Sequence, residues 1–273
     1  MGAGMKEEDE IKFIVPAMSH DQVLIFTNQG IVFGMETLDL PEGASTGKGK
    51  HLKNLIALRD NEHVVTLLPI RDALGGNLIF VTAKGLVKQT PVDQFQNIQS
   101  KGRAAITITQ GDSLVRVLYA DQPHPLFLQT QKGMCIQFDS GSLRPSGRTA
   151  QGVCGMRLKP NDQIIDAELI TTQDPQILIV TELGYAKRVD GDNFRLQNRG
   201  GMGLKSHKTG SGDVVALLQV HPGDELMAFS RMGQAIRVDC ETIRETGRVA
   251  RGVRIMDLQE DDMVTSIGLI REL

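Results

Sequence analysis

A pair of glycines nineteen residues apart recurs along this chain and constrains its fold more than any other feature. Four pairs are complete, and a fifth has alanine at its second position. The pairs are Gly30 and Gly49, Gly133 and Gly152, Gly184 and Gly203, Gly233 and Gly252, and Gly85 with Ala104. Their first members lie 48 to 55 residues apart. A period near 50 residues is typical of propeller-like or solenoid folds, in which each unit closes its core against its neighbours.

The fourth unit shows how one repeat is organised. An apolar run rich in β-branched residues, 176–180, predicts a buried strand, and Gly184 suits the positive φ of a tight hairpin turn. A return strand is expected at 185–189, followed by the loop 197–203, a further strand, and a closing strand at 214–220. Four short antiparallel strands per unit, repeated five times, predict an all-β, propeller-like fold.

The other units repeat this order. Their first strands are expected at 23–26, 77–81, 125–128 and 225–229, and their closing strands at 64–68, 114–119, 164–169 and 263–269. The acids that precede the closing strands are Asp60 and Glu62, Asp112, Asp162, Asp213 and Asp262. We therefore expect blades at 21–72, 73–121, 122–172, 173–221 and 222–273 in a single domain. Residues 1–20 resemble the end of a further, truncated blade, which predicts that the natural protein is longer.

The composition suits a large aliphatic core. The chain has 273 residues, of which 40% are hydrophobic but only 4% aromatic, with no Trp. No apolar run is long enough for a membrane span and no signal peptide is recognisable, so we expect a cytoplasmic, nucleoid-associated protein with no membrane partner. Three cysteines without a CxxC spacing predict reduced, buried thiols.

The charges are segregated along the chain, although the net charge is only −3. Five segments contain no Asp or Glu and hold sixteen of the thirty Lys and Arg residues: 45–53, 95–110, 140–161, 193–212 and 246–256. Such segregation can produce a strong local field even when the total charge is near zero.

Each of these segments contains one loop rich in small and basic residues. We call them the five basic loops: 45–51, 100–104, 146–152, 197–203 and 246–252. Small residues let the backbone approach a phosphate closely, and Arg offers a bidentate fork. A single basic glycine loop is usually a solvated turn, but five in register predict a belt of cations along one edge of the blades.

Such a belt suits a curved polyanion. DNA wrapped on a protein is held by phosphate neutralisation and bendability, with little base reading. Duplex DNA is favoured over single strands, because two Tyr and nine scattered Phe offer no stacking platform. The predicted DNA-binding residues are Lys48, Lys50, Lys53, Lys101, Arg103, Arg148, Arg157, Arg195, Arg199, Lys205, Arg248, Arg251 and Arg254.

Several stretches resemble a known family, the C-terminal DNA-wrapping domains of DNA gyrase A and of its paralogue in topoisomerase IV. The similarity is strongest at 23–30, 47–56, 184–188 and 247–253, and 47–56 is closer to the gyrase form. The resemblance implies a β-pinwheel of about five to six four-stranded antiparallel blades that exchange hairpins. It also implies a bacterial type IIA topoisomerase, in which this domain wraps DNA to present a segment for strand passage and negative supercoiling.

One departure from the family pattern concerns supercoiling. Gyrases carry a Q-R-R-G-G-K-G box, usually in the first blade, that is needed for full wrapping. The nearest match here, at 197–203, lies in a later blade and has Asn198 and Met202 in place of Arg and Lys. If the box is missing, the chain would bind and bend DNA without supporting supercoiling.

Catalytic motifs are not recognisable in this sequence. Neither Tyr119 nor Tyr185 has the neighbouring Arg of a topoisomerase nucleophile, and both are interpreted as packing residues. No P-loop occurs, and the histidines show no ligand spacing. His51 and His207 lie near basic loops and are best interpreted as solvated surface residues. We expect a non-catalytic domain without metal or cofactor. ATP and Mg would belong to the parent enzyme, and the expected protein partners are its catalytic core and its ATPase subunit.

Two alternatives remain open. A topoisomerase IV domain would wrap DNA weakly, so its affinity would gain little beyond about two helical turns of duplex. A protein-interaction propeller would expose an apolar or aromatic patch at one mouth, which the low aromatic content disfavours.

Overall fold

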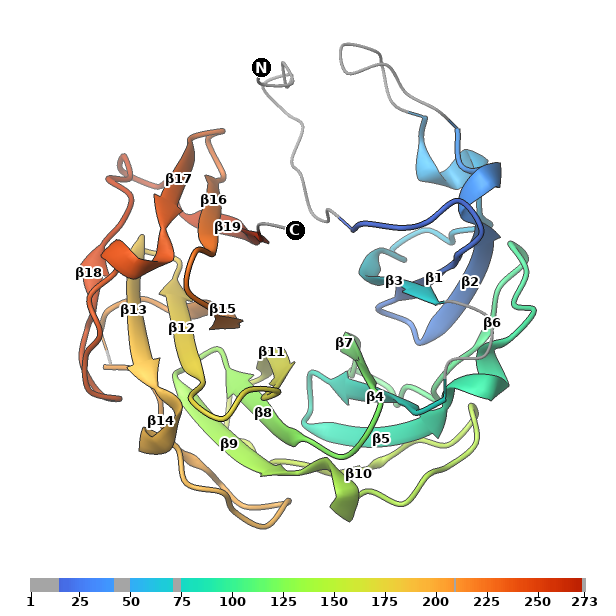
Figure 1. Cartoon of the computed structure of the whole chain (residues 1–273), viewed down its shortest axis with the longest axis horizontal. Helices are drawn as coiled ribbons and strands as arrows, with labels where there is room; N and C mark the ends of the chain where they lie inside the picture. Colours follow the sequence, from blue (N-terminus) through green and yellow to red (C-terminus); the bar gives the residue numbers. More distant parts are fainter. Residues whose placement is uncertain (1–14, 42–49, 71–74, 209, 272–273) are drawn as a thin grey trace. The chain divides into compact units, whose positions relative to one another are not determined.

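The computed structural model describes residues 15–41, 50–70, 75–208 and 210–271, and these residues form β-strands joined by turns and short 3-10 helices (Figure 1). They divide into two compact units. The first contains the described residues of 15–122 and 143–153, and the second contains those of 123–142 and 154–271. The truncated blade predicted at 1–20 falls mostly outside the described residues. No helix among the described residues is long and apolar enough to cross a membrane.

The first unit contains two four-stranded antiparallel blades. The first blade has the order β3-β1-β2-β6, with β1 at Gln22–Thr27, β2 at Ile31–Glu36, β3 at Val64–Ile70 and β6 at Arg103–Ala104. The second has the order β10-β5-β4-β7, with β4 at Asn77–Thr82, β5 at Leu86–Pro91, β7 at Leu114–Ala120 and β10 at Val153–Cys154, of which Val153 belongs to this unit. The first and closing strands therefore lie where the sequence predicted them.

The second unit contains three blades built in the same way. One has the order β11-β8-β9-β14, with β8 at Pro125–Thr130, β9 at Met134–Asp139, β11 at Ile164–Leu169 and β14 at Leu204–Lys205. The next has the order β15-β12-β13-β18, with β12 at Gln176–Thr181, β13 at Tyr185–Asp190, β15 at Val214–Val220 and β18 at Val253–Arg254. The last has the order β17-β16-β19, with β16 at Glu225–Ser230, β17 at Ala235–Asp239 and β19 at Val264–Ile270.

The fourth strand of a blade is contributed by the following repeat. Strand β6 belongs to the second repeat but pairs with β2 of the first, and β14 and β18 pair in the same way with β9 and β13. We call the edge that carries this exchanged strand the outer edge of the blade. This exchange is the hairpin swap that the pinwheel resemblance implies. In the last blade, β17 has no exchanged partner among the described residues, so three strands are seen there instead of the predicted four.

The hairpin turns confirm the roles predicted for their glycines. Gly30 and Gly184 have φ of 76° and 74°, and a Cβ on either would lie 2.7 or 2.6 Å from a backbone oxygen. In four repeats the acid before the closing strand binds the hairpin turn of its own repeat: Glu62, Asp112, Asp162 and Asp262. The carboxylate of Asp213 instead binds the side chains of Gln131 and Lys132 in the preceding hairpin. Asp162, for example, accepts hydrogen bonds from Thr130 Oγ1 at 2.7 Å and from the backbone N–H of Lys132 at 3.0 Å. These acids are therefore built into the hairpin turns rather than the basic loops.

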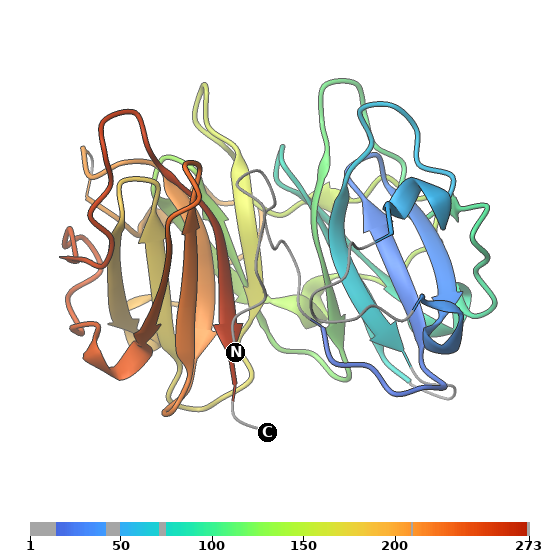
Figure 2. The same cartoon turned by 90° about the horizontal axis from the view of Figure 1, so that it is seen from above.

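The core of each unit is aliphatic with a few aromatic contacts. Phe26, Phe80 and Phe95 meet with ring centroids 5.7 to 6.0 Å apart in the first unit, and Phe127 packs edge-on against Phe194 at 4.9 Å in the second. Within the second unit the sheets of β12 and β16, yellow and orange in Figure 2, stack face to face. The first strands β1, β4, β8 and β12 are buried at every residue after the first, so both of their faces are covered, which explains their continuous apolar runs. The last blade is more open, since β17 alternates between exposed and half-buried residues.

The three cysteines are free, and one differs from the prediction. Cys135 and Cys240 are buried as expected, but Cys154 is exposed. Cys154 lies on the short exchanged strand β10, whose residues are exposed on the outer edge of the second blade.

Candidate nucleic-acid interface

The basic loops of the third and fifth repeats fold alike because each adds to the outer edge of the preceding blade. Ser146 donates its backbone N–H to Gln89 O at 2.9 Å, and Thr246 donates to Arg188 O at 2.9 Å. A tight turn follows in both loops, closed by the N–H of Ala150 or Ala250. The loops therefore start from equivalent points on the strands β5 and β13.

The second glycine of each described pair ends its loop where the backbone presses against the preceding blade. Gly152, Gly203 and Gly252 have φ of 101°, 72° and 89°. A Cβ on Gly152 would lie 2.9 Å from Val87 O, and Gly203 and Gly252 face the carbonyls of the equivalent strands even more closely. These positions require glycine on both conformational and steric grounds. Gly49 lies outside the described residues.

The exception in the second repeat has a structural explanation. Ala104 lies on β6 and is exposed, so its side chain meets no crowded backbone. The positive φ has moved to Gly102, with φ of 76°, where a Cβ would lie 2.5 Å from the ring of Phe33. The shorter loop 100–104 therefore keeps a glycine but at a different place.

The structure places most of the predicted DNA-binding residues in solvent. Ten are exposed: Lys50, Lys53, Lys101, Arg103, Arg157, Arg195, Arg199, Lys205, Arg251 and Arg254. Arg148 and Arg248 are half-buried, and Lys48 lies outside the described residues. The exposed cations of the second, fourth and fifth loops lie on or beside the exchanged strands, at the outer edges of the blades within each unit: Lys101, Arg103, Arg199 and Arg251.

Few of these cations are neutralised by the protein itself. Among the described residues, only Lys53 and Arg254 of this set contact a carboxylate, at 3.4 Å to Asp60 and 3.0 Å to Asp257. Arg199 instead donates to the backbone oxygen of Cys154 at 3.3 Å. Direct ion pairs with carboxylates are therefore few among the described cations of this set.

Two of the predicted arginines meet on one tyrosine. The guanidinium of Arg251 lies 4.0 Å from the centroid of the Tyr185 ring, and that of Arg254 lies 5.4 Å from it. Both donate to the Tyr185 hydroxyl, at 2.5 and 2.9 Å. The hydrogen bond from Arg254, followed by the positive charges, lowers the pKa of Tyr185. This arrangement orients both cations.

Tyr185 contacts two of the predicted DNA-binding residues, which the sequence did not reveal. Its ring is buried, as the packing interpretation predicted, but its hydroxyl is also the common acceptor for the arginine pair. The residues meet because Tyr185 on β13 pairs directly with Arg254 on the exchanged strand β18. Only that long-range strand register brings them together, so no local sequence signal could show it.

The histidines near the loops behave differently from each other. His51 is exposed and caps a short helix by accepting from the backbone N–H of Lys53 at 3.2 Å. His207 is buried, which corrects the prediction of a solvated side chain. Burial, reinforced by the charge of Lys187, lowers the pKa of His207 to about 4, so this imidazole is neutral at physiological pH. It packs against the turn at Gly133 and is not available to a phosphate.

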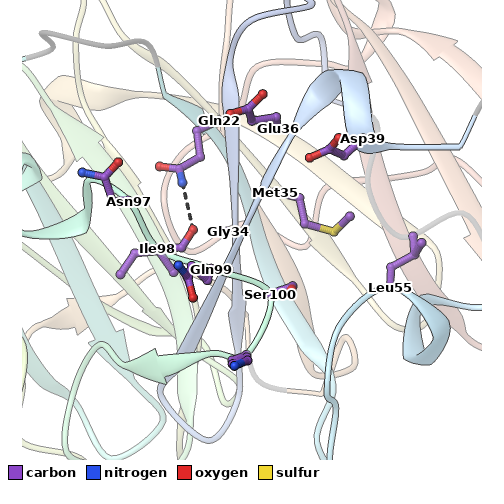
Figure 3. A pocket seen from close by; sticks show the side chains of 11 residues that line it. Gln22, Gly34, Met35, Glu36, Asp39, Leu55, Asn97, Ile98, Gln99 and Ser100 are labelled. Carbon is purple, nitrogen blue, oxygen red and sulfur yellow. Dashed lines mark hydrogen bonds between the residues drawn. The ribbon is translucent and has the colours of Figure 1, made fainter.

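A hollow of about 440 Å³ lies in the first unit beside the second basic loop (Figure 3). Gln22 closes one side by donating to the backbone oxygen of Ile98 at 2.9 Å. The lining includes the carboxylates of Glu36 and Asp39 but a single cation, Lys101. This charge does not suit a phosphate, so we do not include the hollow in the candidate interface. No cluster of three or more potential metal ligands occurs among the described residues.

With this geometry established, comparisons identify the family. Five segments, residues 21–71, 76–121, 124–171, 175–221 and 224–271, match the family described as DNA gyrase C-terminal domain, beta-propeller. The chain belongs to this family. The matched segments follow the five repeats described above, and the β-pinwheel resemblance stated from the sequence is confirmed at the level of the family.

Curated relatives in the family are DNA gyrase A proteins. DNA gyrase A of Haloquadratum walsbyi is 37% identical over 275 residues, which are 98% of this chain and 32% of that protein. DNA gyrase A of Staphylococcus aureus is 33% identical over 276 residues, 99% of this chain and 31% of that protein. The chain thus spans about a third of the length of the curated relatives it matches.

Solved structures share the fold over nearly all of the chain. The C-terminal domain of DNA topoisomerase IV is 26% identical with a TM-score of 0.88, covering 98% of this chain and 84% of that one. A DNA gyrase A C-terminal domain has a TM-score of 0.83 at 24% identity, covering 98% of this chain and 89% of that one. The fold is therefore common to both branches of the family.

Proposed function

We propose that this chain is a non-catalytic domain that binds and wraps duplex DNA within a gyrase-type topoisomerase. The observation that supports this most directly is the set of ten exposed cations on or beside loops that contain no acid. The curated relatives are DNA gyrase A proteins, which agrees with a DNA ligand. We assign the chain to gyrase rather than to topoisomerase IV because of these relatives.

The physical basis of binding is neutralisation of phosphates at successive blades. Each blade whose outer edge carries an exchanged strand offers one basic loop at the same point of the repeat. A duplex held in this way is recognised by its backbone and its ability to bend, with little sequence preference. Strand cleavage and ATP hydrolysis, with ATP and Mg, would belong to the topoisomerase core and the ATPase subunit that this domain serves.

A salt series tests DNA binding. The affinity of a fluorescent duplex of about 40 base pairs would be measured by anisotropy between 50 and 300 mM salt. If eight to twelve cations contact phosphates, log K should fall against log salt with a slope of about −7 to −11. A slope near zero, or no binding at the lowest salt, would refute the proposal.

Wrapping is tested separately from binding. The affinity should keep rising with duplex length over many helical turns, and the linking number of a relaxed plasmid closed in the presence of the chain should shift. An affinity that stops rising at about two turns, with an unchanged linking number, would favour the weak wrapping expected for a topoisomerase IV domain. Because 197–203 lacks the full glycine-rich box, a shifted linking number need not be accompanied by supercoiling in the parent enzyme.

A further inference from the structure

Two lysines outside the predicted DNA-binding set are buried beneath basic loops. Lys88 on β5 is 2% exposed and Lys187 on β13 is 0% exposed. Both are the third residue of the return strand, so they occupy equivalent positions in their repeats. Fully buried lysines are rare and are retained only where their ammonium groups are well bonded.

Each ammonium group is bonded to carbonyls of the next repeat's loop. Lys88 Nζ donates to Gly147 O at 3.0 Å and to Arg148 O at 2.7 Å, and its third bond goes to Ala105 O at 2.7 Å. Lys187 Nζ donates to Ala250 O at 2.9 Å and, over a short distance, to Arg248 O. The two lysines therefore fix equivalent loops, 146–152 and 246–252, through the backbone.

The planarity of the peptide unit determines what these bonds present to solvent. In a trans peptide the C=O of one residue and the N–H of the next point in opposite directions, and no described peptide is cis. Turning a loop carbonyl inward to a lysine therefore turns the following N–H away from it. The N–H groups concerned are those of Arg148, Thr149, Val249 and Arg251, and none of them donates to another group of the described chain.

We propose that Lys88 and Lys187 are positioning residues that shape these two loops into phosphate-binding sites made of backbone N–H groups. The ligand is a phosphodiester of duplex DNA, so this inference rests on the proposed function. In loop 146–152 the free N–H groups of Arg148 and Thr149 are successive, as in an anion-binding concavity. In loop 246–252 the free N–H groups of Val249 and Arg251 flank Ala250, whose own N–H donates to Gly247 O. The half-buried side chains of Arg148 and Arg248, in the same loops, add positive charge.

The cost of burying these lysines indicates that stability alone does not explain them. Burial, followed by the nearby positive charge of Arg148, lowers the pKa of Lys88 to about 8. Burial also lowers the pKa of Lys187 to about 8. Cys135 opposes this shift, and the positive charge of Arg248 adds to it. An apolar residue would avoid this desolvation penalty.

The third blade provides the internal comparison. Its equivalent return-strand residue is Ile136, which is buried and lies under the basic loop 197–203. A Cβ on Gly201 of that loop would lie 3.4 Å from the Ile136 side chain. The fold therefore accepts an apolar residue at this position, and the lysines are a feature of particular loops.

The test uses Lys187→Met and Lys88→Met, with Ile136→Met as the matched control. Amide signals of the wild type would be followed by transverse-relaxation-optimised NMR as a duplex of about 40 base pairs is added at low salt. We expect the N–H signals of Arg148, Thr149, Val249 and Arg251 to shift. In Lys187→Met the shifts of Val249 and Arg251 should be lost, and DNA affinity should fall by about three- to tenfold, as for the loss of one or two hydrogen bonds to a phosphate. Ile136→Met should bind as the wild type.

The outcomes separate the two proposals. If the wild type does not bind duplex DNA, the proposed function fails. If it binds and the four amides do not shift, the function stands and this inference is overturned. If a Met variant fails to fold, Lys187→Gln, whose amide can donate to one carbonyl, replaces it, and the wild-type amide shifts still decide. A native Lys187→Met that keeps wild-type affinity and amide shifts would also overturn the inference.

Discussion

Removing three loop arginines should weaken DNA binding by a calculable amount. Arg199, Arg248 and Arg251 lie in two basic loops of one unit, and none of them contacts a carboxylate among the described residues. If each neutralises one phosphate, replacing all three by Ala should make the salt slope less negative by about 2.7, since each contact contributes about 0.9. At about 0.15 M salt the same coefficient corresponds to roughly a 170-fold loss of affinity, or about 3 kcal/mol.

The assay is the anisotropy salt series on two unrelated duplex sequences of equal length. The loss should be the same for both, because phosphate contacts carry no sequence information. The matched control replaces three exposed cations of the hairpin turns, Lys84, Lys132 and Arg231, by Ala. It removes the same charge away from the basic loops and should change the slope much less.

Two results would refute this reasoning. If the loop variant keeps the wild-type slope, the basic loops are not the contact points. If the hairpin-turn control loses as much affinity as the loop variant, binding responds to total charge and not to the loops. In either case circular dichroism and thermal melting should show that both proteins remain folded.

Three further predictions concern the loops and their supports. In denaturant titrations, Gly252→Val should lower the free energy of unfolding by about 1 to 3 kcal/mol, because φ is +89° and Ala186 O blocks a Cβ. The control Gly247→Ala should change this free energy little, because a Cβ there meets open space. Equal losses of stability in the two variants would contradict the argument. Tyr185→Phe removes the hydroxyl that accepts hydrogen bonds from two arginines, so DNA affinity should fall about two- to fivefold while the melting temperature stays unchanged. An unchanged DNA affinity would show that the hydroxyl does not orient the two arginines. The pKa of Lys187 is lowered from 10.5 to about 8, so the unfolded chain binds more protons than the folded chain between these pH values. The free energy of unfolding of the wild type should therefore rise relative to that of Lys187→Met as the pH rises from 8 to 10.5. A constant difference between the two proteins would contradict the lowered pKa.

The sequence predicted the repeat and its local structure well, since these depend on neighbouring residues. The turn glycines, such as Gly184, were identified because a tight hairpin requires positive φ. The first strands and closing strands were found from apolar runs, and the pre-strand acids were separated correctly from the basic loops. The exposure of most loop cations followed from their composition.

Long-range pairing lay beyond the sequence. The exchanged strands β6, β10, β14 and β18 are two residues long and carry no periodic pattern, so their partners could not be identified from residues alone. The buried state of Lys88, Lys187 and His207 was missed for the same reason. Charged and imidazole side chains are usually exposed, and only contact with another repeat made them part of the interior.

The sequence by itself therefore determined a tandem all-β repeat with a basic, acid-free loop in each unit. Tertiary structure alone decided that each loop from the second repeat onward lies against the preceding blade, where Tyr185 collects two arginines and the buried lysines turn loop carbonyls inward. The physical reason is that turns and buried strands are specified by local φ preferences and hydrophobic pattern, whereas strand exchange is specified by the pairing of residues 67 to 73 positions apart.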